Sequence, residues 1–129
     1  MTTVAYAAVT QSGLSFDRQL WMRPEIIPGL RRLTDAIHAE GAAAGIQLGH
    51  CGNMSHKSIC GCMPVGASSG FNLYSPTFVR GLRADELPEM ARAYGRSVNL
   101  AREAGFDSVE IHAGHGYLIS QFLSPSTNH

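Results

Sequence analysis

Apolar residues in the first half of the chain follow a strand pattern, then a helix pattern, then a strand pattern again. Thr2–Val9 combines small and β-branched residues and is typical of a buried strand. From Pro28, which suits a first helical turn, to about Glu40, apolar residues recur at helical spacing. Gly41 then marks a helix end, and Gly45–Gly49 is a short apolar strand. The first half therefore predicts a strand, a helix and a second strand.

The second half repeats this alternation after a long interruption. Cys51–Arg83 is rich in Gly, Ser, Pro and Asn and shows no period, so it is predicted to be a long irregular loop of a kind that often carries function. A helix follows, with Asp85 as its expected N-cap and Gly105 at its end. Ser108–His112 is predicted to be the next strand, and Tyr117–Leu123 is expected to open another helix.

Strands that alternate with helices indicate an α/β fold with a parallel sheet and right-handed crossovers. Both a barrel and a doubly wound sheet would give this alternation. No glycine-rich dinucleotide fingerprint follows the first strand, and the chain contains no phosphate loop. A nucleotide-binding doubly wound sheet is therefore the less favoured of the two.

Composition narrows the classes of function. The 129 residues are 44% hydrophobic and 16% charged, which suits a globular domain and argues against disorder. Ten basic and ten acidic residues give no net charge, so no basic field favours nucleic acid or an anionic membrane as a partner. No apolar run approaches the roughly 20 residues of a membrane span, and the N-terminus lacks the basic leader of a signal peptide. Three closely spaced cysteines make a poor disulfide framework, so we expect a cytoplasmic location.

Polar side chains gather where the predicted strands end, which is where parallel α/β folds place functional groups. His112 and His115 are either ordinary loop histidines or a pair of N–H donors that polarises a carbonyl oxygen. Tyr117 is either a packed aromatic or a general acid. Gln47 interrupts an apolar strand, so we expect a buried amide that pairs with neighbouring backbone or with a heterocyclic edge such as a flavin pyrimidine. His50 lies just past the end of the same strand.

Five soft or borderline ligands lie within thirteen residues of the loop, which raises an alternative function. A small metal- or thiol-based binding module on the Cys51–Cys62 loop would use these side chains as zinc ligands. The spacing lacks the paired Cys-x2-Cys knuckle, so we interpret the thiols as incidental and assign no metal site. The five candidates are His50, Cys51, His56, Cys60 and Cys62.

Two blocks of the chain resemble a known family. The first is Ile46–His50 with Gly52, and the second is the unbroken run Glu103–Pro125 followed by Thr127–His129. Both blocks are similar to the old yellow enzyme family, nearest to its NADH:flavin oxidoreductase and 2,4-dienoyl-CoA-reductase-like branch. The resemblance extends over nearly the whole chain.

The resemblance implies a TIM (β/α)8 barrel that carries FMN, with residues 1–129 as a fragment of a single domain and about three of its eight strands. It implies hydride transfer from NADH or NADPH through the flavin to the activated alkene of an α,β-unsaturated carbonyl compound, a small-molecule substrate. Gln47 and, more weakly, Tyr6 match positions that contact FMN. His112 and His115 match the pair that binds the substrate carbonyl oxygen, and Tyr117 matches the proton donor.

Three departures from the family qualify this prediction. Asn53 follows Gly52 where relatives commonly carry Arg, which puts a basic contact in doubt. The loop Cys60–Arg83 is unusual and is expected to alter substrate choice. A first strand would precede Met1, and the strands that bind the FMN phosphate would follow His129. We therefore expect a chain that is completed by further sequence or by partner copies, or else a catalytically inactive fragment. Taken alone, it should self-associate through its open sheet edges.

Overall fold

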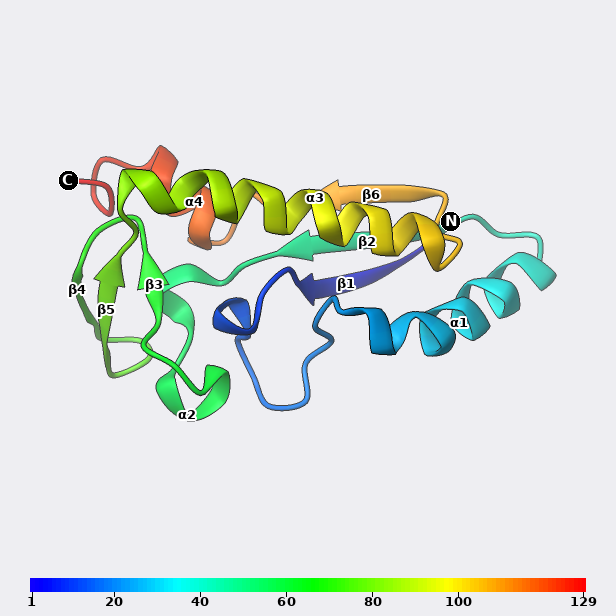
Figure 1. The fold of residues 1–129 in the computed structure, drawn as a ribbon, viewed down its shortest axis with the longest axis horizontal. Helices are drawn as coiled ribbons and strands as arrows, with labels where there is room; N and C mark the ends of the chain where they lie inside the picture. Colours follow the sequence, from blue (N-terminus) through cyan, green and yellow to red (C-terminus); the bar gives the residue numbers. More distant parts are fainter.

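A three-stranded parallel sheet forms the centre of the computed structural model, which describes residues 1–129. Its strands are β1 (Thr2–Ala8), β2 (Ala44–Gly49) and β6 (Ser108–Ile111), in the order β1-β2-β6. Figure 1 shows all three arrowheads pointing toward the same end of the molecule. The carboxyl ends of the strands therefore meet at one edge, as the sequence predicts for an α/β fold with a parallel sheet.

Two helices cover one face of this sheet, as Figure 1 shows. They are α1 (Ile27–Ala39) and α3 (Leu87–Glu103), each a crossover between neighbouring strands. Ile46 and Leu48 of β2 are fully buried against them, whereas Gln47 between them points to the opposite face. The buried core consists of ten residues: Ala7, Val9, Met22, Leu30, Ala44, Ile46, Leu48, Ala101, Ala104 and Phe106. Gln47 is the one residue of β2 that is not buried, so it marks the face of the sheet that points away from the helices.

The start of α3 differs from the prediction that Asp85 is its N-cap. A 3-10 turn, η4 (Ala84–Glu86), precedes the helix, and Glu86 occupies the N-cap position. The Glu86 carboxylate accepts a hydrogen bond of 2.8 Å from the backbone N–H of Arg83 and also pairs with Arg80. Asp85 is free to pair with the Arg83 guanidinium instead. The prediction is wrong because the extra turn moves the capping position by one residue.

A second, small sheet occupies much of Cys51–Arg83, so the prediction of an irregular loop there is wrong in part. Its strands are β3 (Val65–Gly66), β4 (Gly70–Asn72) and β5 (Thr77–Gly81), in the order β3-β5-β4. The same segment contains a 3-10 turn, η3 (Gly52–Met54), and the short helix α2 (Lys57–Cys60). Strands of two to five residues are too short to show a period in the sequence. Figure 1 shows this sheet at the carboxyl edge of the main sheet.

The last helix, α4 (Leu118–Leu123), is anchored to the end of β2. The Leu118 N–H donates a 2.9 Å hydrogen bond to the carbonyl oxygen of His50. Two more 3-10 turns, η1 (Gln11–Gly13) and η2 (Pro24–Ile26), lie between β1 and α1. None of the helices combines the length and apolar character required to cross a membrane.

Candidate active site

Four aromatic rings from the ends of β1 and β6 meet at the carboxyl edge of the main sheet. The His112 and His115 rings lie 4.9 Å apart between centroids, and the Tyr117 ring lies 5.0 Å from His112. Tyr6 completes the group, with its ring 5.3 Å from Tyr117 and 6.1 Å from His112. The structure therefore brings together four of the five residues that the family resemblance assigns to the site, all but Gln47.

A tight turn after β6 produces this convergence. His115 has φ +56° and Gly116 has φ +69°, so two consecutive residues adopt the left-handed conformation. That conformation is unusual for a side chain other than Gly, and it persists only where surrounding contacts enforce it. The Tyr117 N–H donates to the carbonyl oxygen of Gly114 at 3.1 Å and so closes the turn. Tyr117 itself is the N-cap residue of α4.

Gln121 of α4 enforces the turn, a role that the sequence does not reveal. Its side chain is only 2% exposed, and its Nε2 donates to the Gly116 carbonyl oxygen at 2.6 Å. The same Nε2 lies 2.9 Å from Asn53 Oδ1, while Oε1 accepts from the Asn53 N–H at 3.2 Å. A Cβ atom on Gly52 would lie 2.4 Å from the amide. Asn53 therefore stabilises the site instead of supplying a basic contact, and Gly52 leaves the room that Gln121 needs.

The two histidine rings are hydrogen-bonded to each other. His115 Nδ1 lies 3.1 Å from His112 Nε2, so one nitrogen donates and the other accepts. Burial, reinforced by the neighbouring His115, lowers the pKa of His112, although Glu110 opposes the shift. This shift favours the neutral form of His112. Because the two nitrogens are so close, a single oxygen atom has room to lie within hydrogen-bonding distance of both.

Tyr6 and Tyr117 differ in whether their hydroxyl groups are engaged. Tyr6 Oη donates to the Gly13 carbonyl oxygen at 2.9 Å, and burial raises the pKa of Tyr6. The backbone carbonyl of Tyr6 also accepts from Gln19 Nε2 at 3.1 Å. Tyr117 Oη has no intramolecular hydrogen-bond partner and its side chain is partly exposed. Tyr6 is thus a fixed wall of the site, whereas the Tyr117 hydroxyl is available to a ligand.

Gln47 lies on the uncovered face of the main sheet rather than in the core. The prediction of a buried amide is wrong, since Gln47 is partly exposed and points away from α1 and α3. Its Nε2 donates to Glu110 Oε1 at 2.6 Å, because Gln47 and Glu110 are register partners on β2 and β6. The side-chain oxygen of Gln47, Oε1, has no intramolecular hydrogen-bond partner. An amide with an open acceptor on this face fits the polar edge of a flavin ring.

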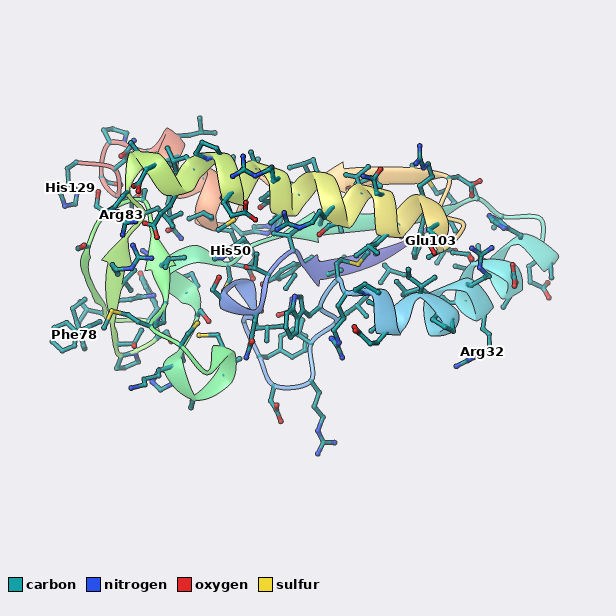
Figure 2. The ribbon with its side chains drawn as sticks, in the orientation of Figure 1. Arg32, His50, Phe78, Arg83, Glu103 and His129 are labelled. Carbon is teal, nitrogen blue, oxygen red and sulfur yellow. The ribbon has the colours of Figure 1, made fainter.

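His50 is separate from this group, although it also follows a strand end. Its side chain is fully buried, and Figure 2 shows it inside the molecule near the end of β2. Nδ1 accepts from the Gly52 N–H at 3.0 Å, which leaves Nε2 to donate to Ser12 Oγ at 3.0 Å. Burial lowers the pKa of His50 to about 4. His50 is a neutral packing residue.

The structure does not bring together the zinc ligands that the alternative function requires. No three His, Cys, Asp or Glu side chains come together as a potential metal site. Cys51 Sγ donates to the Leu14 carbonyl oxygen at 3.2 Å, and His56 caps α2 by accepting from the Ser58 N–H. The Cys62 thiol donates to Cys60 Sγ at 3.6 Å.

A donor pair and two tyrosines at the carboxyl edge of a parallel βα sheet form the kind of site that barrel enzymes carry. The chain matches the NADH:flavin oxidoreductase / NADH oxidase family over residues 1–129, and it belongs to that family. Its predicted cofactors, FMN with NADH or NADPH, are those of the family, so this prediction is confirmed.

Individual relatives support the same assignment. A 4,4'-dithiodibutanoate disulfide reductase from Rhodococcus erythropolis is 41% identical over 99% of this chain, which corresponds to 32% of that protein. An NADPH dehydrogenase from Listeria monocytogenes is 43% identical over 88% of the chain and 32% of its own length. The chain thus spans about a third of the length of these curated relatives.

Solved structures confirm the fold. The old yellow enzyme homologue from Zymomonas mobilis superimposes with a TM-score of 0.93 at 31% identity, over 98% of this chain and 39% of that one. A morphinone reductase in complex with tetrahydroNAD also gives a TM-score of 0.93, at 26% identity, over 98% of this chain and 40% of that one. The predicted fold class, part of a TIM (β/α)8 barrel with three of its strands, is confirmed.

Proposed function

We propose that residues 1–129 form part of a single FMN-binding barrel domain that reduces the activated alkene of an α,β-unsaturated carbonyl compound at the expense of NADH or NADPH. One observation carries the proposal: the 3.1 Å approach of His112 Nε2 and His115 Nδ1 beside the free hydroxyl of Tyr117. When bound, FMN would supply the hydride-transfer chemistry between the nicotinamide and the β-carbon of the alkene. Gln47 would hold the polar edge of the flavin ring.

The histidine pair would bind the substrate carbonyl oxygen. Hydride addition to the alkene moves negative charge onto this oxygen, and two N–H donors directed at it stabilise the charge as it develops. In the structure, one of the two rings accepts from the other. The accepting ring must therefore move its proton to the facing nitrogen when the oxygen arrives. Because the pKa of His112 is lowered, we expect an exchange of tautomers there instead of a gain of charge.

Tyr117 would supply the proton that completes the reduction. Its hydroxyl is free to donate to the α-carbon of the substrate, and its position is fixed as the N-cap of α4. Tyr6 would close the site behind it, because its own hydroxyl is already engaged with Gly13. Gln121 would act as a positioning residue by holding the Gly116 carbonyl group.

A second candidate reaction, the reduction of an organic disulfide, is favoured by the Rhodococcus relative, whose name states that activity. In that reaction the same donor pair would stabilise a carboxylate or thiolate of the substrate. The reaction would not require Tyr117 as a proton donor. Turnover with 4,4'-dithiodibutanoate and with a simple enone distinguishes the two reactions.

The cytoplasmic location and the self-association of the isolated chain remain predictions.

Tyr117→Phe tests the proposal in the full-length protein. The substitution keeps the ring and deletes only the hydroxyl, so reoxidation of the reduced flavin by an enone should slow by about 10²–10⁴-fold. Stopped-flow absorbance separates this step from flavin reduction by NAD(P)H. Tyr74→Phe is the matched control, since it removes the same hydroxyl from a side chain that is 91% exposed in the small sheet region. Reoxidation of Tyr117→Phe at the wild-type rate would remove Tyr117 from the mechanism.

A further inference from the structure

Two cysteines outside the active site lie close enough to react with each other. Cys60 Sγ and Cys62 Sγ are 3.6 Å apart, with only Gly61 between them in the chain. Cys60 is buried at the end of α2, and Cys62 is exposed. The third thiol, Cys51, is buried and donates to the Leu14 carbonyl oxygen instead.

We propose that Cys60 and Cys62 form a redox-active dithiol that reduces small organic disulfides of the glutathione disulfide type and closes into an intramolecular disulfide. The exposed Cys62 thiolate attacks one sulfur of the disulfide and forms a mixed disulfide, which releases the first thiolate. Cys60 then attacks the Cys62 sulfur and displaces the second thiolate. The dithiol loses two electrons and two protons, and the organic disulfide gains them as two thiols.

The geometry between the two residues permits this closure. A disulfide requires the sulfurs to approach from 3.6 Å to about 2.05 Å. Gly61 has φ +70°, and a Cβ at this position would meet only the Gln11 side chain, so the intervening backbone has room to adjust. A ring closed by a single intervening residue departs from relaxed disulfide geometry. Such a bond is more easily reduced than a relaxed one, so an excess of the organic disulfide over its thiol is needed to drive the exchange toward closure.

The contrast in exposure assigns the two roles. A small disulfide can reach Cys62 from solvent, whereas Cys60 Sγ is sheltered and points toward the Cys62 backbone, 3.2 Å from its carbonyl oxygen. Partial desolvation, together with the hydrogen bond that the Cys62 thiol donates to Cys60 Sγ, raises the pKa of Cys62 to about 11. The attacking thiolate is therefore scarce at neutral pH, and the exchange is slow. An equilibrium measurement is the appropriate test for this reason.

Tryptic mass spectrometry gives that measurement directly. The reduced full-length protein is equilibrated with a large excess of glutathione disulfide, quenched in acid, and alkylated after unfolding. Trypsin cleaves after Lys57 and Arg80, so Cys60 and Cys62 lie in one peptide and Cys51 in another. We expect the Ser58–Arg80 peptide to be lighter by two hydrogens and to escape alkylation, while the Cys51 peptide is alkylated. Alkylation of both Cys60 and Cys62 at equilibrium would overturn the proposal.

Two variants assign the order of the steps. Cys60→Ser removes the resolving thiol, so a glutathione adduct should accumulate on Cys62 and persist. Cys62→Ser removes an exposed group, leaves the buried Cys60 in place, and should give neither the adduct nor the cross-link. Cys51→Ser is the matched control and should form the cross-link normally. An equally stable adduct in the wild type and in Cys60→Ser would contradict the resolving role of Cys60.

Discussion

The main sheet and the small sheet differ in how they are covered. The main sheet buries one face against α1 and α3, with Ile46 and Leu48 fully enclosed. The small sheet leaves most of its large apolar side chains in solvent, and Figure 2 shows Phe78 projecting away from the ribbon. The exposed set is Phe71, Leu73, Tyr74 and Phe78. The candidate active site lies at the strand ends of the covered sheet, where packing fixes the direction of those ends.

Polar contacts near the site join the two regions. Asn72 of β4 donates to the Asn53 backbone carbonyl at 2.6 Å, and Asn53 in turn contacts Gln121. The small sheet is thus attached to the turn that orients His115 and Tyr117. Because its exposed apolar side chains lie outside the main core, we still expect this region, and not the main sheet, to influence substrate choice.

The largest difference between the two regions should appear in the free energy of unfolding. Leu48→Ala removes a fully buried side chain from the main core and should cost about 2–5 kcal/mol. Phe78→Ala removes a side chain that is 71% exposed and should change stability by roughly 0.5 kcal/mol or less. Urea unfolding of both variants measures this contrast. Equal losses would mean that the small sheet is packed as firmly as the main one.

A smaller effect should come from the buried His50 beside the active site. Its pKa is lowered from 6.5 to about 4, so between these values the unfolded chain binds a proton that the folded chain does not. The free energy of unfolding is therefore highest above pH 6.5, where His50 is neutral in both states. It decreases as the pH falls, and about 3 kcal/mol is lost by pH 4. Urea unfolding from pH 7 to pH 4 should show a flatter profile for His50→Asn. An unchanged profile would contradict the assignment of His50 as a neutral packing residue.

Local patterns in the sequence predict the main sheet and the histidine pair. The long apolar periods of α1 and α3 identify those helices, and the short spacing between His112 and Tyr117 places them in one turn. Contacts that depend on register are not visible in the sequence. Tyr6 joins His112 only because β1, β2 and β6 pair in that order, and Gln47 meets Glu110 for the same reason.

Burial at strand ends is a second property that the sequence does not disclose. His50 and His112 both follow strands and both are buried, yet His50 is fully enclosed and bonded to Ser12 and Gly52, whereas the His112 ring lies against those of His115 and Tyr117. The role of Gln121 depends on Gly52 and Gly116, which lie far apart in the chain. The strands of the small sheet are too short for any periodicity to identify them.

The most direct test of the account is the half-reaction kinetics of the double variant His112→Ala/His115→Ala in the full-length protein. Loss of even one donor to a developing oxyanion costs on the order of 10²–10³ in rate, so enone-dependent reoxidation should fall by at least that factor. Flavin reduction by NAD(P)H should suffer less, and His56→Ala, which removes a partly exposed ring near the small sheet, should leave both steps near the wild-type rate. Stopped-flow reoxidation of the double variant at the wild-type rate would contradict the proposed function.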